Sequence, residues 1–128
     1  MPTTVPTRNE DAGSPWDVIL AYVLNVGSPG GTVRPALVVQ SDHNNARLNE
    51  TIIAAITSNI SRVPEATQLL IDVATTDGAA SGLLHNSAVR CERLHPIPQA
   101  DVRRVIVYLS RPLMQKIDDC LKAALGIP

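Results

Sequence analysis

An arginine and a threonine stand at points in this chain where two neighbouring β-strands would bring them together. Arg34 opens the apolar stretch of residues 34–40, and Thr57 closes the next apolar stretch, residues 51–57. A guanidinium is a permanently charged planar fork that fits phosphate oxygens, and a threonine hydroxyl can donate to one more. If both stretches belong to one small sheet, the two side chains lie at the same end of it. The pair indicates phosphodiester chemistry that needs no metal ion and no cofactor.

The elements that must position these residues are short strands. Pro35 stands where we expect the second strand to start, and there a missing N–H is tolerated. Proline also keeps the preceding Arg34 in an extended conformation. Alternating or continuous apolar residues predict six strands, at residues 16–24, 36–40, 51–57, 67–73, 87–97 and 102–109.

A single long helix is expected at the end of the chain. Ser110 is a natural N-cap, Pro112 falls in the first turn, and Gly126 provides the stop. Leu113 and Ile117 belong to an apolar stripe at helical spacing, which predicts that this helix packs on the sheet.

Six strands followed by one helix predict a mainly β domain over residues 15–128. The expected architecture is a small SH3-like β-barrel with the helix covering one side. Residues 1–14 contain too little apolar material to pack and are expected to form a flexible tail. Because no apolar run approaches the ~18 residues of a membrane span and no signal peptide is recognisable, we expect a soluble intracellular protein.

The charge of the chain is unevenly distributed. The formal net charge of −1 argues against a general nucleic-acid coat protein. However, residues 85–111 hold five arginines against two acids, whereas residues 1–84 hold four arginines against eight acids. A basic segment in a nearly neutral chain indicates a local site for a polyanion, and the alternative is a solvated strand face.

Four segments in order along the chain carry a resemblance to a known family. They read RPALVVQ, ITSN, SGLLHNSAVRCERLHPI and LSRPLMQKIDDCLKAALGI. This succession resembles the MazF/PemK (Kid) family of bacterial toxins. The resemblance implies a cytoplasmic, sequence-specific endoribonuclease with an SH3-like barrel, and a homodimer that binds single-stranded RNA along the subunit interface. It also implies a cognate antitoxin whose disordered tail occupies the RNA site.

The resemblance also implies which residues act. The catalytic arginine of the family falls on Arg34 and its catalytic threonine on Thr57, while an Arg-Cys-Asp stretch of the Kid branch falls on Arg90, Cys91 and Glu92. The implied reaction is attack by a ribose 2′-OH on the adjacent phosphate, giving a 2′,3′-cyclic phosphate and a 5′-OH. Arginine is a poor base, so we expect Glu92 to accept the 2′-OH proton and Arg90 to assist the leaving oxygen.

Several further residues are candidates for RNA binding. The resemblance implies that the first loop helps to select the bases of the RNA. Gly30 and Gly31 belong to that loop, which here lacks the Glu-Gln pair found in many relatives, and Ser58 and Asn59 follow Thr57. Arg93 is expected on the strand face opposite Arg90, where it meets either RNA or solvent.

Two other functions fit the same fold. Gyrase-poisoning relatives inhibit a protein target without cleaving RNA, but they lack the Arg/Thr pair and carry an aromatic at the end of the last helix. A degenerate toxin would bind antitoxin or RNA without cutting. His43, His85 and His95 lack metal-ligand spacing, and Cys91 and Cys120 are expected to be buried thiols.

Overall fold

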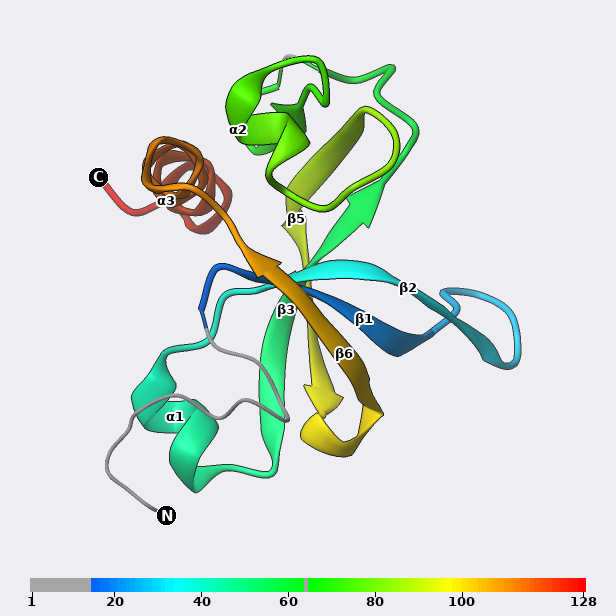
Figure 1. Cartoon of the computed structure of the whole chain (residues 1–128). Helices are drawn as coiled ribbons and strands as arrows, with labels where there is room; N and C mark the ends of the chain where they lie inside the picture. Colours follow the sequence, from blue (N-terminus) through cyan, green and yellow to red (C-terminus); the bar gives the residue numbers. More distant parts are fainter. Residues whose placement is uncertain (1–14, 64) are drawn as a thin grey trace.

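The fold is one antiparallel sheet with a long helix on one face. The computed structural model describes residues 15–63 and 65–128, so the expected tail of residues 1–14 lies outside the described residues. The six strands are hydrogen-bonded in the order β4-β5-β3-β2-β1-β6 (Figure 1). They are β1 Asp17–Leu24, β2 Gly31–Val38, β3 Glu50–Thr57, β4 Gln68–Ile71, β5 Ser87–Pro98 and β6 Val102–Tyr108.

All six expected strands are present, but the bounds of the second were wrong. Strand β2 begins at Gly31, so Arg34 and Pro35 lie inside it rather than at its start. The strand extends because its whole length pairs with β1, from Val18 opposite Leu37 to Leu24 opposite Gly31. Pro35 is tolerated there because β2 has a hydrogen-bonded partner on one side only at this point, as at a sheet edge.

The sheet is open in its hydrogen-bonded order, with β4 at one end and β6 at the other. The strands nevertheless twist strongly and cross one another in projection (Figure 1). The mainly β architecture with a C-terminal helix is confirmed, and closure into an SH3-like barrel stays a prediction.

Helix α3, Arg111–Leu125, is bounded as its sequence predicts. The Ser110 Oγ accepts from the Leu113 N–H at 3.4 Å, and Gly126 ends the helix with φ of 69°, in the left-handed region that favours glycine. Leu113 and Ile117 are buried against β4 and β5. Burying each such side chain contributes roughly 1.5–3 kcal/mol, so this stripe is what holds the helix on the sheet.

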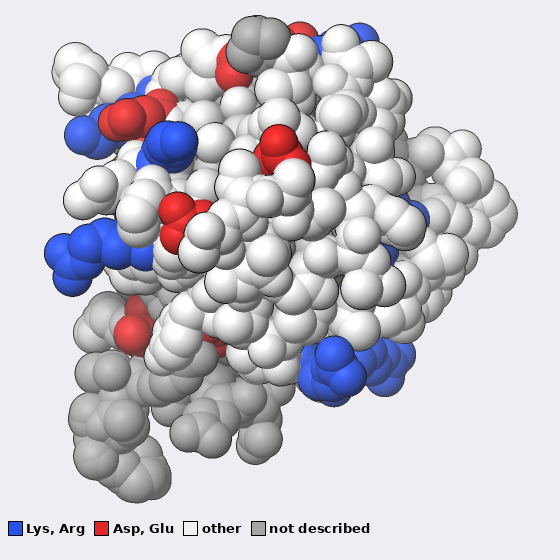
Figure 2. Space-filling view, turned by 45° about the horizontal axis from the view of Figure 1, so that its top comes forward, with Lys and Arg blue, Asp and Glu red and all other residues white. Residues whose placement is uncertain are grey.

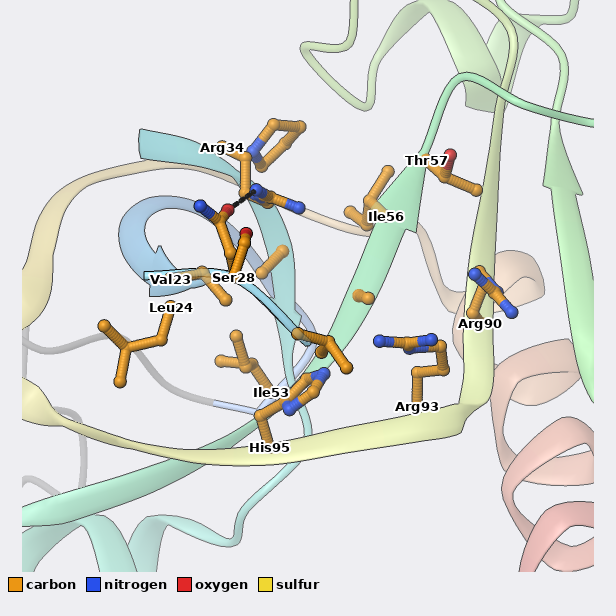
Figure 3. A pocket seen from close by; sticks show the side chains of 15 residues that line it. Val23, Leu24, Ser28, Arg34, Ile53, Ile56, Thr57, Arg90, Arg93 and His95 are labelled. Atoms are coloured by element: carbon orange, nitrogen blue, oxygen red, sulfur yellow. Dashed lines mark hydrogen bonds between the residues drawn. The ribbon is translucent and has the colours of Figure 1, made fainter. Parts of the chain in front are cut away.

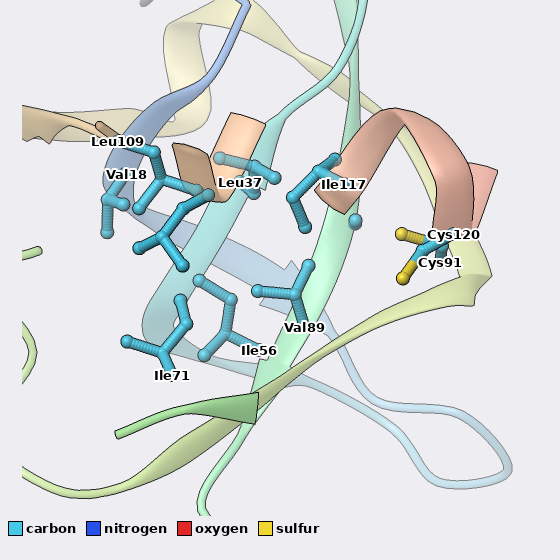
Figure 4. Packing of buried hydrophobic residues seen from close by; sticks show 11 residues of the cluster. Val18, Leu37, Ile56, Ile71, Val89, Cys91, Leu109, Ile117 and Cys120 are labelled. Carbon is cyan, nitrogen blue, oxygen red and sulfur yellow. The ribbon is translucent and has the colours of Figure 1, made fainter. Parts of the chain in front are cut away.

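The core under α3 is aliphatic and contains both thiols. Val18, Leu37, Ile56 and Val89 meet the helix in one buried cluster, and Cys91 and Cys120 lie within it (Figure 4). Burial, followed by the neighbouring Cys120, raises the pKa of Cys91 to about 12. A thiol that resists ionisation to this degree is a packing residue, as the sequence predicts.

A second buried cluster occupies the face of the sheet opposite α3. Because side chains alternate along a strand, Ile53 of β3 belongs to this cluster while Ala54 and Ile56 belong to the first. Three short helices join the strands: α1 Asp42–Arg47, α2 Thr76–Ala79 and the 3₁₀ turn η1 Gln99–Asp101.

Candidate active site

Strands β2 and β3 stop pairing before they reach Arg34 and Thr57. They pair only through three positions, ending at Ala36 opposite Ala55. The same register continued for two residues would put Arg34 directly opposite Thr57. Because the pairing stops first, the strands leave a gap there, and we call this gap, bounded by Arg34, Pro35, Ile56 and Thr57, the notch.

A cleft of about 370 Å³ opens on the face opposite α3 and reaches the notch. Ala36 and Ala55 line it between the functional residues, and their small side chains leave the space hollow. None of the fifteen lining residues is acidic. Five of them carry polar or charged groups suited to a phosphodiester (Figure 3): Arg34, Thr57, Arg90, Arg93 and His95.

On the face that Figure 2 shows, the basic side chains do not form one continuous surface. The centre of this face is largely uncharged, basic and acidic groups lie near one another at its left edge, and further basic groups lie at its lower edge. The three arginines of the cleft are therefore a local concentration of positive charge without acidic neighbours in its lining. Such an arrangement favours a local anion over a general polyanion surface.

Arg34 is held in place by neutral acceptors. Its Nη2 donates to the Thr32 Oγ1 at 2.6 Å and to the Asn25 Oδ1 at 3.2 Å, and its Nε donates to Thr32 at 3.1 Å. Asn25 is itself tied to the Pro29 carbonyl at 3.2 Å. Neither acceptor carries a charge, so the exposed guanidinium is oriented while its full positive charge stays available to an anion.

Thr57 keeps a hydroxyl proton to donate. Its Oγ1 accepts from the Asn59 N–H at 3.1 Å, and within the described part of the chain its proton has no acceptor. The side chain is half-buried at the end of β3. Ser58 and Asn59, expected to contact RNA, are exposed beside it.

Arg90 and Glu92 form an ion pair in which the arginine faces the cleft. The Arg90 Nε donates to the Glu92 Oε2 at 3.1 Å, and the carboxylate also accepts from the Gln68 Nε2 at 2.6 Å and the Thr67 Oγ1 at 3.0 Å. Desolvation acts to raise the pKa of Glu92, but the hydrogen bonds from its own backbone N–H, Gln68, Arg90 and Thr67 together lower it. Glu92 is not among the cleft-lining residues, so its contact with the site runs through Arg90.

The placement of Arg93 on the opposite face of its strand was wrong. The register of β3 and β5 shifts between Ala54, opposite Leu94, and Ala55, opposite Arg90. Three residues of β5 therefore fall between two successive positions of β3, and this bulge changes which face later side chains occupy. Arg93 consequently lines the same cleft as Arg90.

His95 belongs to the cleft although the sequence singled it out only as a poor metal ligand. It lies opposite Ile53, on the same face as the cleft. Burial, followed by the nearby charges of Arg93 and Arg34, lowers the pKa of His95 below its ordinary value of 6.5. This shift favours the neutral imidazole, the form that can accept a proton. His95 is two residues after Arg93, and residues two apart on a strand share a face. This spacing would have predicted His95 in the cleft if Arg93 had been placed there.

The glycines of the first loop shape the backbone beside the site. Gly30 has φ of 81°, and a Cβ on Gly31 would lie 2.9 Å from the Tyr22 ring, so both positions require glycine. Neither lines the cleft, whereas their loop neighbours Val26 and Ser28 do. Contact of Gly30 or Gly31 with RNA stays a prediction.

In residues 15–63 and 65–128, no group of three or more His, Cys, Asp or Glu side chains could hold a metal ion. None of the helices in the same part combines the length and the apolar character needed to span a membrane.

Comparison with known sequences supplies a family. Residues 14–125 match the family described as PemK-like, MazF-like toxin of type II toxin–antitoxin system. The chain is also 31% identical over 102 residues to Endoribonuclease EndoA of Bacillus subtilis, an alignment that covers 80% of this chain and 84% of the relative.

Comparison with solved structures shows the same fold. The Mycobacterium tuberculosis toxin MazF-mt6 superposes with a TM-score of 0.69 at 22% identity, covering 88% of this chain and 98% of the toxin. An endoribonuclease in complex with its cognate antitoxin from a mycobacterial species superposes with a TM-score of 0.70 at 17% identity, covering 90% and 96%. At these identities the likeness establishes the architecture.

Proposed function

Because this chain belongs to the PemK-like, MazF-like toxins of type II toxin–antitoxin systems, we propose that it cleaves single-stranded RNA at a specific sequence without a metal ion. One observation carries the proposal. Arg34, whose charge no acid compensates, and Thr57, whose hydroxyl proton is unpartnered within the described residues, line a single cleft free of acidic side chains.

The reaction is an internal transesterification of RNA. The ribose 2′-oxygen attacks the adjacent phosphorus, and the bond from phosphorus to the 5′-oxygen breaks, leaving a 2′,3′-cyclic phosphate and a 5′-OH. Negative charge accumulates on the equatorial phosphate oxygens during this step, and Arg34 and Thr57 donate to them. Arg90 lies beyond Thr57 in the cleft and stabilises the departing 5′-oxygen, which takes up a proton from solvent or from a donor in the site.

Two side chains are candidates for accepting the 2′-OH proton. Glu92 is the residue expected from the family motif, although its lowered pKa and its bonds to Gln68 and Arg90 weaken it as a base. His95 lines the cleft, and its lowered pKa favours the neutral imidazole while making it a weaker base. Rate–pH profiles of Glu92→Gln and His95→Gln separate the two, because only the variant lacking the acceptor loses the acidic limb of the profile.

The direct test is cleavage of a long RNA in excess EDTA, followed by mapping of the new 5′ ends. We expect 5′-OH ends at one repeated short sequence, and their loss in Arg34→Ala. The matched control is Arg47→Ala, because Arg47 is an exposed arginine on α1 whose side chain bonds, among the described residues, only to Asn44. Ends that carry 5′-phosphate, or cuts that need a metal, contradict the mechanism. No cuts at all would leave a non-cleaving toxin-fold binding protein.

We also propose that the chain forms a homodimer and binds a cognate antitoxin. Leu24 and Val26, at the start of the loop joining β1 and β2, are 68% and 70% exposed beside the cleft. Apolar side chains at the rim of a charged cleft suit an antitoxin segment that covers it. Sedimentation of the purified toxin tests the dimer. Loss of RNA binding when the toxin is purified with its co-expressed antitoxin tests the complex.

A further inference from the structure

A second cavity meets the cleft at the notch. This cavity, which we call the groove, has a volume of about 650 Å³. It shares with the cleft the four residues that bound the notch, Arg34, Pro35, Ile56 and Thr57. The two cavities therefore adjoin at the pair of residues to which we assign the chemistry.

The groove lies on the other face of the sheet from the cleft. Leu20 of β1 is opposite Pro35 of β2 on one side and opposite Arg104 of β6 on the other. Residues directly opposite one another share a face, and all three line the groove. Ile56 completes the row and belongs to the core cluster under α3, so this row runs along the face that carries the helix.

The loop before β5 closes the groove from the other side. Gly82 has φ of 77°, and a Cβ there would lie 2.5 Å from the Ile106 Cγ2, so the loop sits tightly against β6. The next residues, Leu83, Leu84 and His85, form the wall. Because Gly82 packs against Ile106 of β6, this wall is held in place by the sheet.

The chemistry of the groove suits a nucleotide. Arg104 is exposed and makes no hydrogen bond or ion pair with another residue in the described part of the chain, and no acid lines the cavity. Leu84, which lines the groove, is 87% exposed, and the next residue in the chain, His85, lines the groove as well. A guanidinium can hold a phosphate while apolar and imidazole side chains receive an unstacked base.

We propose that the RNA strand passes through the notch from one face of the sheet to the other, and that a nucleotide next to the scissile phosphate occupies the groove with its phosphate on Arg104. This inference rests on the proposed function, because it takes the scissile phosphate to lie between Arg34 and Thr57. Arg104 is a binding residue in this arrangement and takes no part in the chemical step.

The test compares Arg104→Ala with Arg103→Ala. Arg103 is the preceding residue of β6, is equally exposed, and lines neither the cleft nor the groove. For a long RNA substrate we expect Arg104→Ala to lower kcat/KM about 10-fold, mainly through KM, because one charge-assisted contact is lost. The dependence of log KM on log salt concentration should fall by about 0.7–1, the value for one phosphate contact. Arg103→Ala should match the wild type.

Shortened substrates locate the nucleotide. One oligonucleotide is trimmed on the 5′ side of the scissile bond and another on the 3′ side, and one of them should show equal kcat/KM for wild type and Arg104→Ala. An equal loss in Arg103→Ala, or the same loss with both trimmed substrates, overturns the proposal. So does a change in sedimentation of Arg104→Ala, which would mark the groove as a contact between copies of the chain.

A binding measurement separates this inference from the proposed function. An RNA with a 2′-deoxyribose at the scissile position cannot be cleaved, so its affinity reports only on binding. If the wild type does not cleave RNA but Arg104→Ala weakens this affinity about 10-fold while Arg103→Ala does not, the groove stands and the catalytic proposal falls. If neither substitution changes the affinity, the groove proposal is wrong whatever the activity.

Discussion

Strand β3 carries two threonines on one face, Thr51 near its start and Thr57 at its end, and the chain uses them differently. Thr51 is fully buried, and its Oγ1 donates to the Asn45 Oδ1 at 2.7 Å. Thr57 is half-buried, and in residues 15–63 and 65–128 its Oγ1 takes part in one hydrogen bond, which it accepts from the Asn59 N–H. The first hydroxyl is committed to the fold, whereas the second retains a proton for a ligand.

The difference arises from the neighbouring elements. At the start of β3, α1 brings Asn45 over the strand, where it also accepts from the Gln40 Nε2 at 2.9 Å and donates to the Gln40 carbonyl at 3.0 Å. Each of these buried polar groups finds a partner, which favours rigidity. At the other end the pairing of β2 with β3 stops at Ala36 opposite Ala55, and the Thr57 proton has no acceptor among the described residues. A residue becomes available for function where the surrounding hydrogen bonds are left incomplete.

The largest expected effect comes from removing Arg34, which lies on β2 beside the Thr57 end of β3. We expect Arg34→Ala to lower kcat about 10³-fold, since it removes the main donor to the phosphate oxygens. Arg34→Lys should recover little of this, because a lysine lacks the planar fork that Thr32 and Asn25 orient. Single-turnover cleavage measures both values. Activity in Arg34→Lys close to that of the wild type would show that charge alone suffices.

Thr57→Val tests the unpartnered hydroxyl at the same end. We expect a loss of about 10²-fold in kcat with little change in stability, because the substitution removes a donor while retaining the shape of the side chain. Thr57→Ser keeps the hydroxyl and is the matched control, so its activity should stay within a few-fold of the wild type. Equal losses in the two variants would assign Thr57 a packing role.

Thr51→Val should show the opposite pattern. It removes one buried hydrogen bond, while Asn45 keeps its bond from Gln40, so we expect a loss of about 1 kcal/mol in the free energy of unfolding. That corresponds to a Tm lower by roughly 4 °C for a domain of this size. Urea unfolding and cleavage assays check it together. A drop in kcat of the folded variant would mean that the two ends of β3 are coupled.

The smallest expected effect concerns Glu92, beside the open end. Its pKa is below the ordinary value of 4.5, so its stabilising contribution is fully present above pH 4.5 and disappears as the pH falls through the lowered pKa. Glu92→Gln should therefore cost less than ~1 kcal/mol at pH 7, and this cost should shrink as the pH falls through the lowered pKa. Urea unfolding at several pH values measures this, with Glu65→Gln, an exposed acid nearby, as control. A constant difference at every pH would exclude the ion pair as its cause.

Much of the fold was predictable because its signals are local. Ser110 and Gly126 bound α3 through interactions within a few residues, and the apolar run that follows Arg104 is enough to predict β6. The notch and the bulge were not predictable in this way. Both depend on where pairing between distant strands stops or slips, and Arg93 was placed wrongly for that reason.

The amino-acid sequence alone determined the elements, the family resemblance and the choice of Arg34 and Thr57, because residue types and short spacings carry that information. Only the tertiary structure decided which side chains have partners: Asn25 and Thr32 on Arg34, Gln68 on Glu92, and none for the Thr57 proton within the described residues. These outcomes depend on strand register and on the twist of the sheet, which are set by packing across the whole domain.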